Sequence, residues 1–564
     1  MIKVLFPGLL DAPVVQLELL LVLASLALGI GRFRLVVIDH YFRRFSGHPR
    51  AAFALCVVLA LALHLAVAPG MTRHAPEVHD EFSYLLSADT FLHGSIVNPP
   101  HPLWRSFETA HVLFWPHYAS MYPPAQGLML AGGKLLFGDY LAGPWLASAL
   151  LAGLAGWMLA AWVPRRWAVF GAFLVALRFS VFSYWGNSYW GGAIPAIGGL
   201  LLFGGVPRIL HKARPRDATL MAIGLIMMAA SRPFDGILAL VSAGFSCLAV
   251  RRRHFWGWRL SLPSLATASI ILAAGLASLL YYNWRVTGNP LVSGYNVSMQ
   301  QYGWAVFPWQ STIASNPPLN RNLAALYESQ HEWFLSHRTP MGFIASRCVA
   351  FGRFWAFYLS PLFTLPLLVT PVLAYSKRWR WILIAGVFYA VGLGLNPWFF
   401  PHYAAPAMGL LLLALIQAAR IASIAKAGNK RPFALTVRAI PVVCVAVFAF
   451  RATMPLLGLQ LPNSTFEMSW FCTPAGNQER AAVQARLEHE PGRHLVLVRY
   501  EPDHLASIEW VYNAARIDEA KVIWAHDLDT ATNARLLAYY AGRRVWHLDA
   551  DAKPPRPAEE DGRR

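Results

Sequence analysis

Long apolar stretches recur along this chain from residue 14 to about residue 458, with polar segments between them. Each stretch can cross the ~30 Å hydrocarbon core of a bilayer as a helix, and a helix satisfies its own backbone hydrogen bonds in lipid. The pattern therefore predicts an all-α polytopic membrane domain with about 12 transmembrane helices. The apolar stretches are 14–31, 52–69, 140–163, 168–184, 194–206, 218–231, 236–250, 262–282, 356–375, 382–398, 403–424 and 440–458.

Clusters of Lys and Arg between these stretches predict the orientation, because cytoplasmic loops of membrane proteins carry an excess of both residues. The clusters are 32–50, 164–167, 207–216, 251–259, 377–380 and 420–438. An even number of predicted crossings separates each consecutive pair. We expect an N-terminal helix and basic cytoplasmic segment over 1–50, and a transmembrane domain over 51–458 with exported loops at 70–125 and 283–350. The expected location is the plasma membrane, meaning the bacterial inner membrane.

The C-terminal segment 459–551 has a different pattern. Three short apolar runs, 494–500, 521–526 and 544–548, are typical of buried strands, and helical patterns at 503–515 and 529–541 separate them. This alternation predicts a small α/β domain with parallel strands, which follows the last membrane helix and is therefore extracytoplasmic. It has no Gly-rich phosphate loop, so nucleotide binding is not indicated. The last residues, 552–564, are expected to be disordered.

Composition supports a membrane protein and argues against a nucleic-acid partner. Hydrophobic residues make up 56% of the chain and charged residues only 14%. The net charge of +19 comes mostly from the short basic clusters between apolar stretches, which is a topology signal. The five Cys residues are scattered without a CxxC pair, so neither a disulfide framework nor a zinc site is predicted.

The first exported loop contains the strongest candidate for chemistry, the run from His79 to Tyr84 with its adjacent carboxylates Asp80 and Glu81. A carboxylate can act as a general base that takes a proton from an attacking hydroxyl or amine. The alternative is an acidic helix start, where carboxylates interact favourably with the helix dipole.

Three further charged residues have two interpretations each. Arg232 interrupts an apolar hairpin, and it is expected either to bind a lipid phosphate or to form an ion pair with Asp235. Arg285 opens the second exported loop, where it could contact phosphate or extend to lipid headgroups. Glu108 is either a second carboxylate of the site or the partner of Arg105.

Several histidines in the first loop raise the question of a metal. None of them has i,i+4 spacing beside a third ligand, so the pattern is a poor metal signature. No cofactor is therefore assigned, and a divalent metal stays open. The histidines are His74, His79, His93, His101, His111 and His117.

Four short motifs stand in order along the chain: Asp80-Glu81 before a helix ending at His93-Gly94, Tyr122-Pro123-Pro124, Leu136-Phe137-Gly138, and His402-Tyr403-Ala404-Ala405-Pro406. Taken together, these motifs resemble the GT-C superfamily of polyprenyl-phosphate-sugar-dependent glycosyltransferases. That superfamily includes protein mannosyltransferases, lipid A aminoarabinose transferases and lipopolysaccharide-core transferases. The resemblance covers roughly residues 50–425.

Two positions depart from the family pattern. Lipid A aminoarabinose transferases have a Lys where this chain has Tyr122, and the late Arg of the family is His402 here. Both family positions are cationic and lie near the lipid phosphate. The decisive structural observation is therefore whether Asp80 faces a cavity shared with Arg232 and His402.

The resemblance implies a hexosyl- or pentosyltransferase that moves a sugar from a polyprenyl-phosphate donor to an extracytoplasmic lipid, glycan or protein acceptor, with inversion. Asp80 would act as the general base, and Glu81 is assigned to the catalytic pair. The residues expected to shape the site or hold the donor phosphate are Arg232, Arg285, His402, Tyr403, Tyr122 and Glu108.

Two other classes of function fit the pattern less well. A lipid or solute transporter would use about 12 helices, but the chain shows no repeated halves and carries an acidic pair in a long loop. A non-catalytic scaffold would use the C-terminal segment for docking, and its function would survive loss of Asp80 and Glu81.

Overall fold

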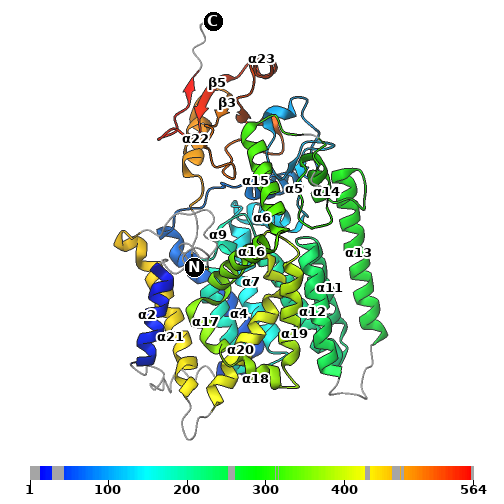
Figure 1. Cartoon of the computed structure of the whole chain (residues 1–564), viewed down its shortest axis with the longest axis vertical. Coiled ribbons are helices and arrows are strands. Elements are labelled where there is room, and N and C mark those ends of the chain that lie inside the picture. Colours follow the sequence, from blue (N-terminus) through cyan, green and yellow to red (C-terminus); the bar gives the residue numbers. More distant parts are fainter. Residues whose placement is uncertain are drawn as a thin grey trace.

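The computed structural model describes a bundle of helices with a small domain containing a β-sheet at one end (Figure 1). The described residues are 13–27, 44–251, 261–310, 313–315, 317–425, 432–459, 470–471 and 475–559. The basic clusters at 32–50, 251–259 and 420–438 fall partly or mostly outside these ranges.

The bundle is built from helices that mostly overlap the predicted apolar stretches, whereas the helix over 340–354 lies in the predicted second loop. They are α2 (Pro13–Ala27), α4 (Pro49–Val67), α7 (Ala142–Leu159), α8 (Arg165–Val175), α9 (Tyr184–Asn187), α10 (Ala193–Lys212), α11 (Pro215–Ala229), α12 (Pro233–Arg251), α13 (Leu262–Thr287), α16 (Pro340–Phe354), α17 (Ser360–Leu367), α18 (Thr370–Tyr375), α19 (Arg380–Leu393), α20 (Met408–Ile424) and α21 (Pro432–Thr453).

Seven helical segments among the described residues are long and apolar enough to cross a membrane, and three shorter apolar helices accompany them. A multi-pass helical membrane protein is confirmed, whereas the count of about 12 stays a prediction. Several predicted spans fall short of the length that a crossing needs, the 14-residue α19 among them. The stretch 168–184 contains the 11-residue α8 followed by a π-helical turn over Ala176–Ser180, and 218–231 lies in the 15-residue α11.

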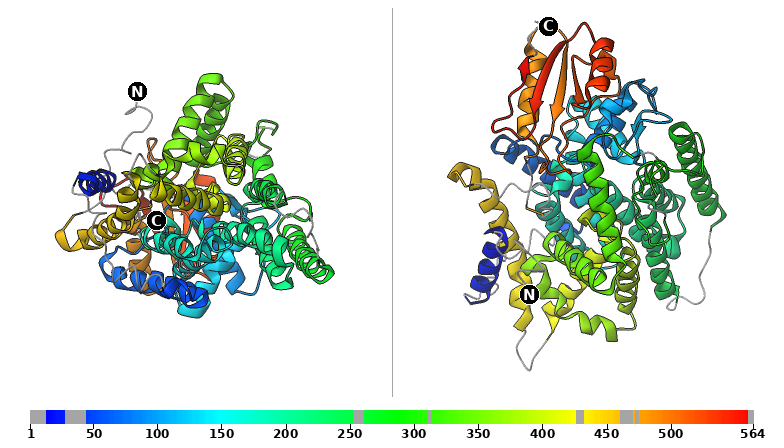
Figure 2. Two further views of the ribbon diagram at one scale, coloured as in Figure 1. Left: turned by 90° about the horizontal axis from the view of Figure 1, so that it is seen from below. Right: turned by 45° about the horizontal axis from the view of Figure 1, so that its top comes forward.

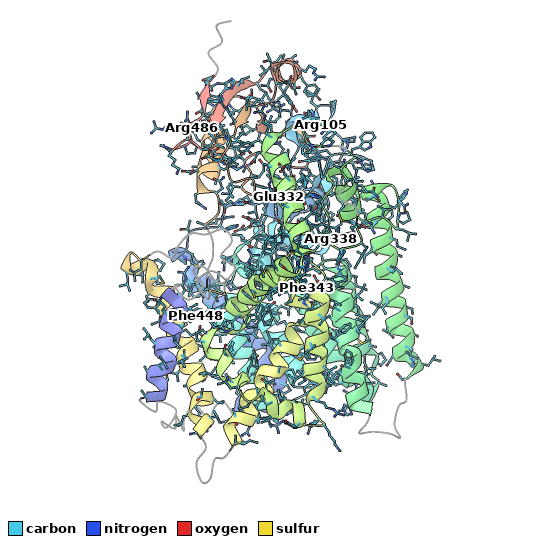
Figure 3. All side chains as sticks on the ribbon, viewed as in Figure 1. Arg105, Glu332, Arg338, Phe343, Phe448 and Arg486 are labelled. Atoms are coloured by element: carbon cyan, nitrogen blue, oxygen red, sulfur yellow. The ribbon has the colours of Figure 1, made fainter. Side chains whose placement is uncertain are left out.

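The two predicted loops lie with the C-terminal domain at one end of the bundle (Figures 1 and 2). Arg105 and Arg486 mark this end in Figure 3, whereas Phe448 lies in the bundle. The predicted second loop, 283–350, is shorter than expected because α16 begins at Pro340, where the Thr339 hydroxyl caps the helix by accepting a hydrogen bond from the Gly342 N–H at 3.1 Å. The loop elements are α5 (His79–Leu92), β1 (Val112–Leu113), β2 (Ala119–Ser120), α6 (Ala125–Phe137), α14 (Gly294–Tyr302) and α15 (Arg321–His337).

The C-terminal domain contains a four-stranded sheet in the order β4-β3-β5-β6. As predicted, β3 pairs in parallel with both β4 and β5, and the short β6 adds an antiparallel edge. The elements are α22 (Gln478–His489), β3 (His494–Arg499), β4 (Val522–His526), α23 (Thr530–Tyr539), β5 (Arg544–Asp549) and β6 (Ala558–Glu559).

Two predictions for this domain differ from the structure. The segment 503–515, predicted to be helical, has no helix, because its backbone and side chains bond to the first loop instead. The stretch 552–564, predicted to be disordered, contains β6, which pairs with Trp546 and His547 of β5. Residues 560–564 lie outside the described part of the chain.

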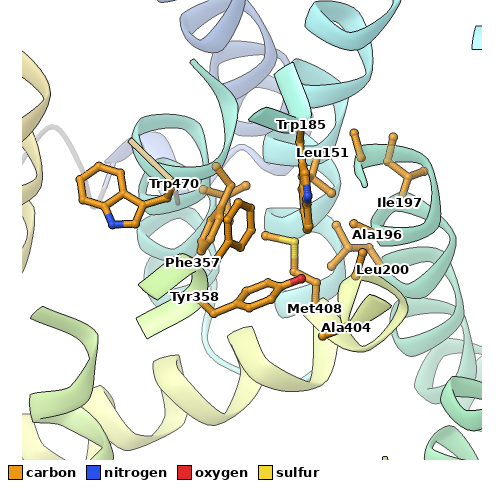
Figure 4. Close-up of a cluster of buried hydrophobic side chains, with 14 of the residues drawn as sticks. Leu151, Trp185, Ala196, Ile197, Leu200, Phe357, Tyr358, Ala404, Met408 and Trp470 are labelled. Carbon is orange, nitrogen blue, oxygen red and sulfur yellow. The ribbon is translucent and has the colours of Figure 1, made fainter. Parts of the chain in front are cut away.

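A buried aromatic cluster supports the segment that carries His402 and Tyr403 (Figure 4). Trp185 and Phe357 are fully buried with ring centroids 4.8 Å apart. The neighbouring Tyr358 donates a hydrogen bond to the carbonyl of Pro401 at 2.7 Å. Because protein interiors are close-packed, this cluster holds residues 401–403 in a fixed position relative to the bundle.

Gly199 on α10 offers a test of that packing. A Cβ atom there would overlap the carbonyl oxygen of Pro406, so α10 can approach this segment only through a glycine. Gly199→Ala is expected to lower the melting temperature of the purified protein, since overpacking costs about 1–3 kcal/mol. Gly132→Ala on α6 is the control, because a Cβ atom there meets nothing within 4 Å, and it should leave the melting temperature unchanged or higher.

Candidate active site

A cavity of about 410 Å³ lies where the two loops, the C-terminal domain and the bundle meet. Asp80, Arg232 and His402 all line it, which is the arrangement that the sequence left to be decided. Tyr122 and Tyr403 line it as well, whereas Glu81, Glu108 and Arg285 are not among its lining residues. Other residues that line the cavity are His79, Tyr84, His111, Trp190, Asp235, Tyr295, Asn296, Trp304, Gln310, Gln330, Trp398, Phe400 and Ser507.

Asp80 is held in the first turn of α5, where the helix dipole favours a negative charge. The Tyr122 hydroxyl donates a short hydrogen bond to its Oδ1. The Nδ1 atom of His111 lies 3.5 Å from Oδ2 and 3.1 Å from the Tyr122 hydroxyl. The Asp80 side chain keeps 22% of its surface exposed, so the carboxylate is fixed on one side and open to the cavity on the other.

The electrostatic surroundings keep Asp80 ionised. Burial raises the pKa of a carboxyl group, but here the charge on His111 and hydrogen bonds from His111 and Tyr122 outweigh it. The pKa of Asp80 is consequently held well below its usual range. At neutral pH the group is a carboxylate with a free lone pair facing the cavity, which is the protonation state that a proton acceptor needs.

Glu81 lies in a different environment although it is the next residue. Its buried carboxylate accepts hydrogen bonds from the backbone N–H of Tyr189 at 3.1 Å, the N–H of Glu77 at 3.1 Å, and Nε2 of His74 at 2.6 Å. These contacts join the chain before α5 to the segment after α9. Glu81 therefore anchors the start of the helix and does not face the cavity.

Arg232 follows the end of α11 and carries both features expected from the sequence. Its Nε donates a short hydrogen bond to Asp235, so the predicted ion pair is formed. Its guanidinium also lies 3.7 Å above the Tyr403 ring and lines the cavity. Among the described residues that line the cavity, Arg232 is the one Arg or Lys.

His402 does not supply the positive charge that the family position carries. Its Nδ1 lies 3.0 Å from the Tyr184 hydroxyl, and its ring packs against the rings of Phe400 and Trp190. Burial, reinforced by the charge of Arg232, holds the pKa of His402 well below its usual range. The imidazole is therefore neutral at pH 7, and it shapes the cavity without adding charge.

Arg285 and Glu108 lie apart from the cavity. Arg285, near the exposed end of α13, donates to the Tyr281 hydroxyl at 3.1 Å. Glu108 accepts a hydrogen bond from Tyr302 at 2.9 Å and lies 3.3 Å from Arg105, which matches the ion-pair interpretation. Burial raises the pKa of Glu108 despite that partner.

Several lining residues were not singled out as site residues from the sequence, among them His111, Tyr295, Trp304 and Ser507. His111 was visible only as one histidine among six, and its backbone has a positive φ of 63° that no sequence pattern predicts. The described part of the chain contains no group of three His, Cys, Asp or Glu residues arranged to hold a metal ion.

The sequence matches no protein-family model and no curated protein. Solved structures of two kinds of protein align with most of the chain at low sequence identity. ArnT from Cupriavidus metallidurans aligns with a TM-score of 0.45 and 13% identity over 88% of this chain and 92% of its own. ArnT bound to undecaprenyl phosphate aligns with a TM-score of 0.42 and 12% identity, over the same shares of the two chains.

The oligosaccharyltransferase of Archaeoglobus fulgidus, tethered to an acceptor peptide, aligns with a TM-score of 0.43 and 9% identity over 89% of this chain. This chain spans between 62% and 69% of the length of the oligosaccharyltransferase chains that it matches.

Proposed function

We propose that the protein is a membrane glycosyltransferase that moves a sugar from a polyprenyl-phosphate donor to an extracytoplasmic acceptor. The observation that carries the proposal is one cavity, at the loop end of an apolar bundle, lined by both an ionised carboxylate and a guanidinium. A carboxylate suits removal of the acceptor proton, and a guanidinium suits the phosphate that leaves. The bundle beneath them offers an apolar surface to an isoprenoid chain.

In the proposed reaction, the acceptor oxygen or nitrogen attacks the anomeric carbon from the face opposite the phosphate. The new glycosidic bond forms, the bond from the anomeric carbon to the phosphate oxygen breaks with its electron pair, and the configuration inverts. Asp80 takes the proton of the acceptor. Because the low pKa of Asp80 makes it a weak base, the proton moves late, once bond formation has made the nucleophile more acidic.

Arg232 is proposed to bind the phosphate while its pairing with Asp235 continues. A guanidinium carries five N–H donors, and Asp235 accepts from Nε, so the Nη groups can donate to phosphate oxygens. Tyr403 stacks under the guanidinium and restricts its direction. Asn296 and Tyr295 also line the cavity and offer neutral donors to the leaving anion.

The proposed donor is lipid-linked because the cavity and the basic clusters are expected on opposite sides of the membrane. Both loops and the C-terminal domain lie at one end of the bundle (Figure 1). The positive-inside rule assigns the basic clusters to the cytoplasm, which gives the cavity an extracytoplasmic location in the plasma membrane. A sugar carried on an isoprenoid lipid reaches that side, whereas cytosolic nucleotide sugars do not.

Tyr122→Phe tests whether the Tyr122 hydroxyl lowers the pKa of Asp80. The Tyr122 hydroxyl lowers the pKa of Asp80, so its removal should raise that pKa. A base works only when it is ionised, and the acid limb of kcat/KM against pH should therefore move to higher pH. Tyr140→Phe is the matched control, because Tyr140 lies outside the cavity lining, and its acid limb should coincide with that of the unchanged protein. Identical profiles for both variants would contradict the assigned role of Tyr122.

Comparing cells with and without the gene product tests the proposed function. Mass spectrometry of polyprenyl-linked sugars and of cell-surface lipids, glycans and proteins should show one lipid-linked sugar accumulating and one sugar modification missing when the gene is lost. Unchanged glycolipids and unchanged surface glycans would argue against a glycosyltransferase. Substrate flux across proteoliposomes without a covalent product would favour the transporter alternative.

A further inference from the structure

An extended segment of the C-terminal domain, residues 506–515, follows the catalytic helix α5 along its length, and we call it the strap. Ile508 forms an antiparallel bridge with Val78, and the Glu509 N–H donates to the carbonyl of Glu77 at 3.0 Å. Further along, Tyr512 stacks on Phe82 with ring centroids 4.7 Å apart. At the far end, the Ala515 N–H donates to Asp89 Oδ2 at 2.8 Å. The strap thus contacts residues on both sides of Asp80.

Glu509 is the buried charge at the centre of the strap. Its Oε1 accepts hydrogen bonds from the N–H groups of Trp510 at 2.8 Å and Val511 at 2.7 Å, and a short one from the Tyr500 hydroxyl. Its Oε2 accepts from the Thr109 hydroxyl at 3.0 Å. Burial raises the pKa of Glu509, but nearby histidines and these hydrogen bonds hold it below its usual value, so the group is a carboxylate.

Thr109 connects this carboxylate to the residue that precedes Asp80. Nδ1 of His79 lies 3.0 Å from the Thr109 hydroxyl and 3.7 Å from Glu509 Oε2. Nε2 of His79 donates to the carbonyl of Ala506, also at 3.0 Å. Nε2 of His79 is therefore bonded to the strap, and Nδ1 lies against Thr109, the partner of Glu509. Holding His79 in this way holds the start of the helix turn that carries Asp80.

The carboxyl ends of the parallel strands also attach the C-terminal domain to the two loops. Ligands of parallel α/β sheets bind at the carboxyl ends of the strands. Here His526, the last residue of β4, donates from Nε2 to the carbonyl of Glu108 at 2.7 Å and accepts at Nδ1 from the Asn320 amide at 2.6 Å. That edge at β4 is occupied by the chain's own loops.

We propose that the C-terminal domain is part of the active site and that Glu509 is a positioning residue for Asp80. The carboxylate holds His79 through Thr109, and the strap holds α5, so that Asp80 meets the acceptor at the correct angle. Ser507 of the strap lines the cavity beside His79 and forms part of its wall. The proposal rests on the proposed glycosyltransferase function.

Glu509→Ala and Glu509→Gln form the test pair. Ala removes all four hydrogen bonds. Gln keeps an amide oxygen for Trp510, Val511 and Tyr500, while its amide N–H can donate to Thr109 and free the Thr109 hydroxyl to donate to Nδ1 of His79. A displacement of about 1 Å at the base can cost about 100-fold in rate. We therefore expect kcat of the Ala variant to fall by about 10- to 100-fold with KM for the lipid donor unchanged, and the Gln variant to recover most of the loss.

Glu519→Gln is the control in the same domain, because Glu519 is exposed and pairs only with Arg516 among the contacts described. Kinetics are measured per folded molecule in the full-length protein, together with hydrogen exchange of a peptide spanning residues 74–83. Faster exchange in the Ala variant, with neither the Gln variant nor the control changed, supports the proposal. An Ala variant with normal kcat and normal exchange would overturn the proposal. So would an Ala variant that gives a lower yield of folded protein but has a normal kcat per folded molecule. If the unchanged protein transfers no sugar, the proposed function fails, while hydrogen exchange still reports whether Glu509 holds α5.

Discussion

Asp80→Asn is expected to abolish sugar transfer in membranes that contain normal amounts of the protein. Asparagine has nearly the same shape and keeps an oxygen for the Tyr122 hydroxyl, so the helix start should be preserved. It cannot take up the acceptor proton, and general-base catalysis contributes about 10²- to 10⁴-fold in rate. Transfer from a polyprenyl-phosphate sugar, measured as labelled product per amount of folded protein, should therefore fall by about that factor.

Asp139→Asn is the matched control for this experiment. Asp139 also belongs to the segment between α4 and α7, but it is paired with Arg73 at 2.7 Å and lies outside the lining of the cavity. The Asp139→Asn variant should transfer sugar at close to the rate of the unchanged protein. Near-normal transfer by the Asp80→Asn variant would remove the basis for a catalytic role of this carboxylate.

Arg232 is expected to produce the second large effect, and its ion pair requires a design with two variants. Arg232→Met alone leaves Asp235 buried without its partner, which costs about 3–5 kcal/mol of stability and lowers the yield of folded protein. The double variant Arg232→Met with Asp235→Leu removes both charges, and replacing a buried pair by apolar residues is often neutral for stability. The double variant should therefore fold but remain unable to transfer sugar, because the phosphate has lost its guanidinium.

The double variant separates the two interpretations of Arg232 that the sequence left open. If the arginine binds donor phosphate, the folded double variant should show a raised KM for the lipid donor, a strongly reduced kcat, or both. If the arginine serves only as the structural partner of Asp235, removing both charges should restore transfer to nearly the normal rate. Thermal unfolding in detergent, measured in parallel, shows which of the variants are folded.

Much of the fold could be predicted because hydrophobic patterns act locally. Apolar stretches of sufficient length form helices wherever they occur, and the runs that became β3, β4 and β5 are apolar enough to form buried strands. The strap could not be predicted in the same way. The segment 503–515 has a helical pattern, but some of its hydrogen bonds go to residues more than 400 positions away in the first loop, and such partners leave no local signal.

The candidate site shows the same division between local and distant effects. Asp80 and Glu81 are equivalent in the sequence, but consecutive side chains point about 100° apart around a helix, so only Asp80 faces the cavity. The role of His402 as a neutral wall follows from burial among aromatic rings, which depends on chain segments distant from it. His111 reaches Asp80 through loop geometry alone.

The most direct test of the account uses purified protein in lipid vesicles with a polyprenyl-phosphate sugar of defined anomeric configuration and candidate acceptors. Product structure and free polyprenyl phosphate are measured together. The account predicts one polyprenyl phosphate released for each sugar transferred, and a glycosidic bond of inverted configuration, with both signals lost in the Asp80→Asn variant. Retained configuration, or transport of intact donor across the bilayer without product, would contradict it.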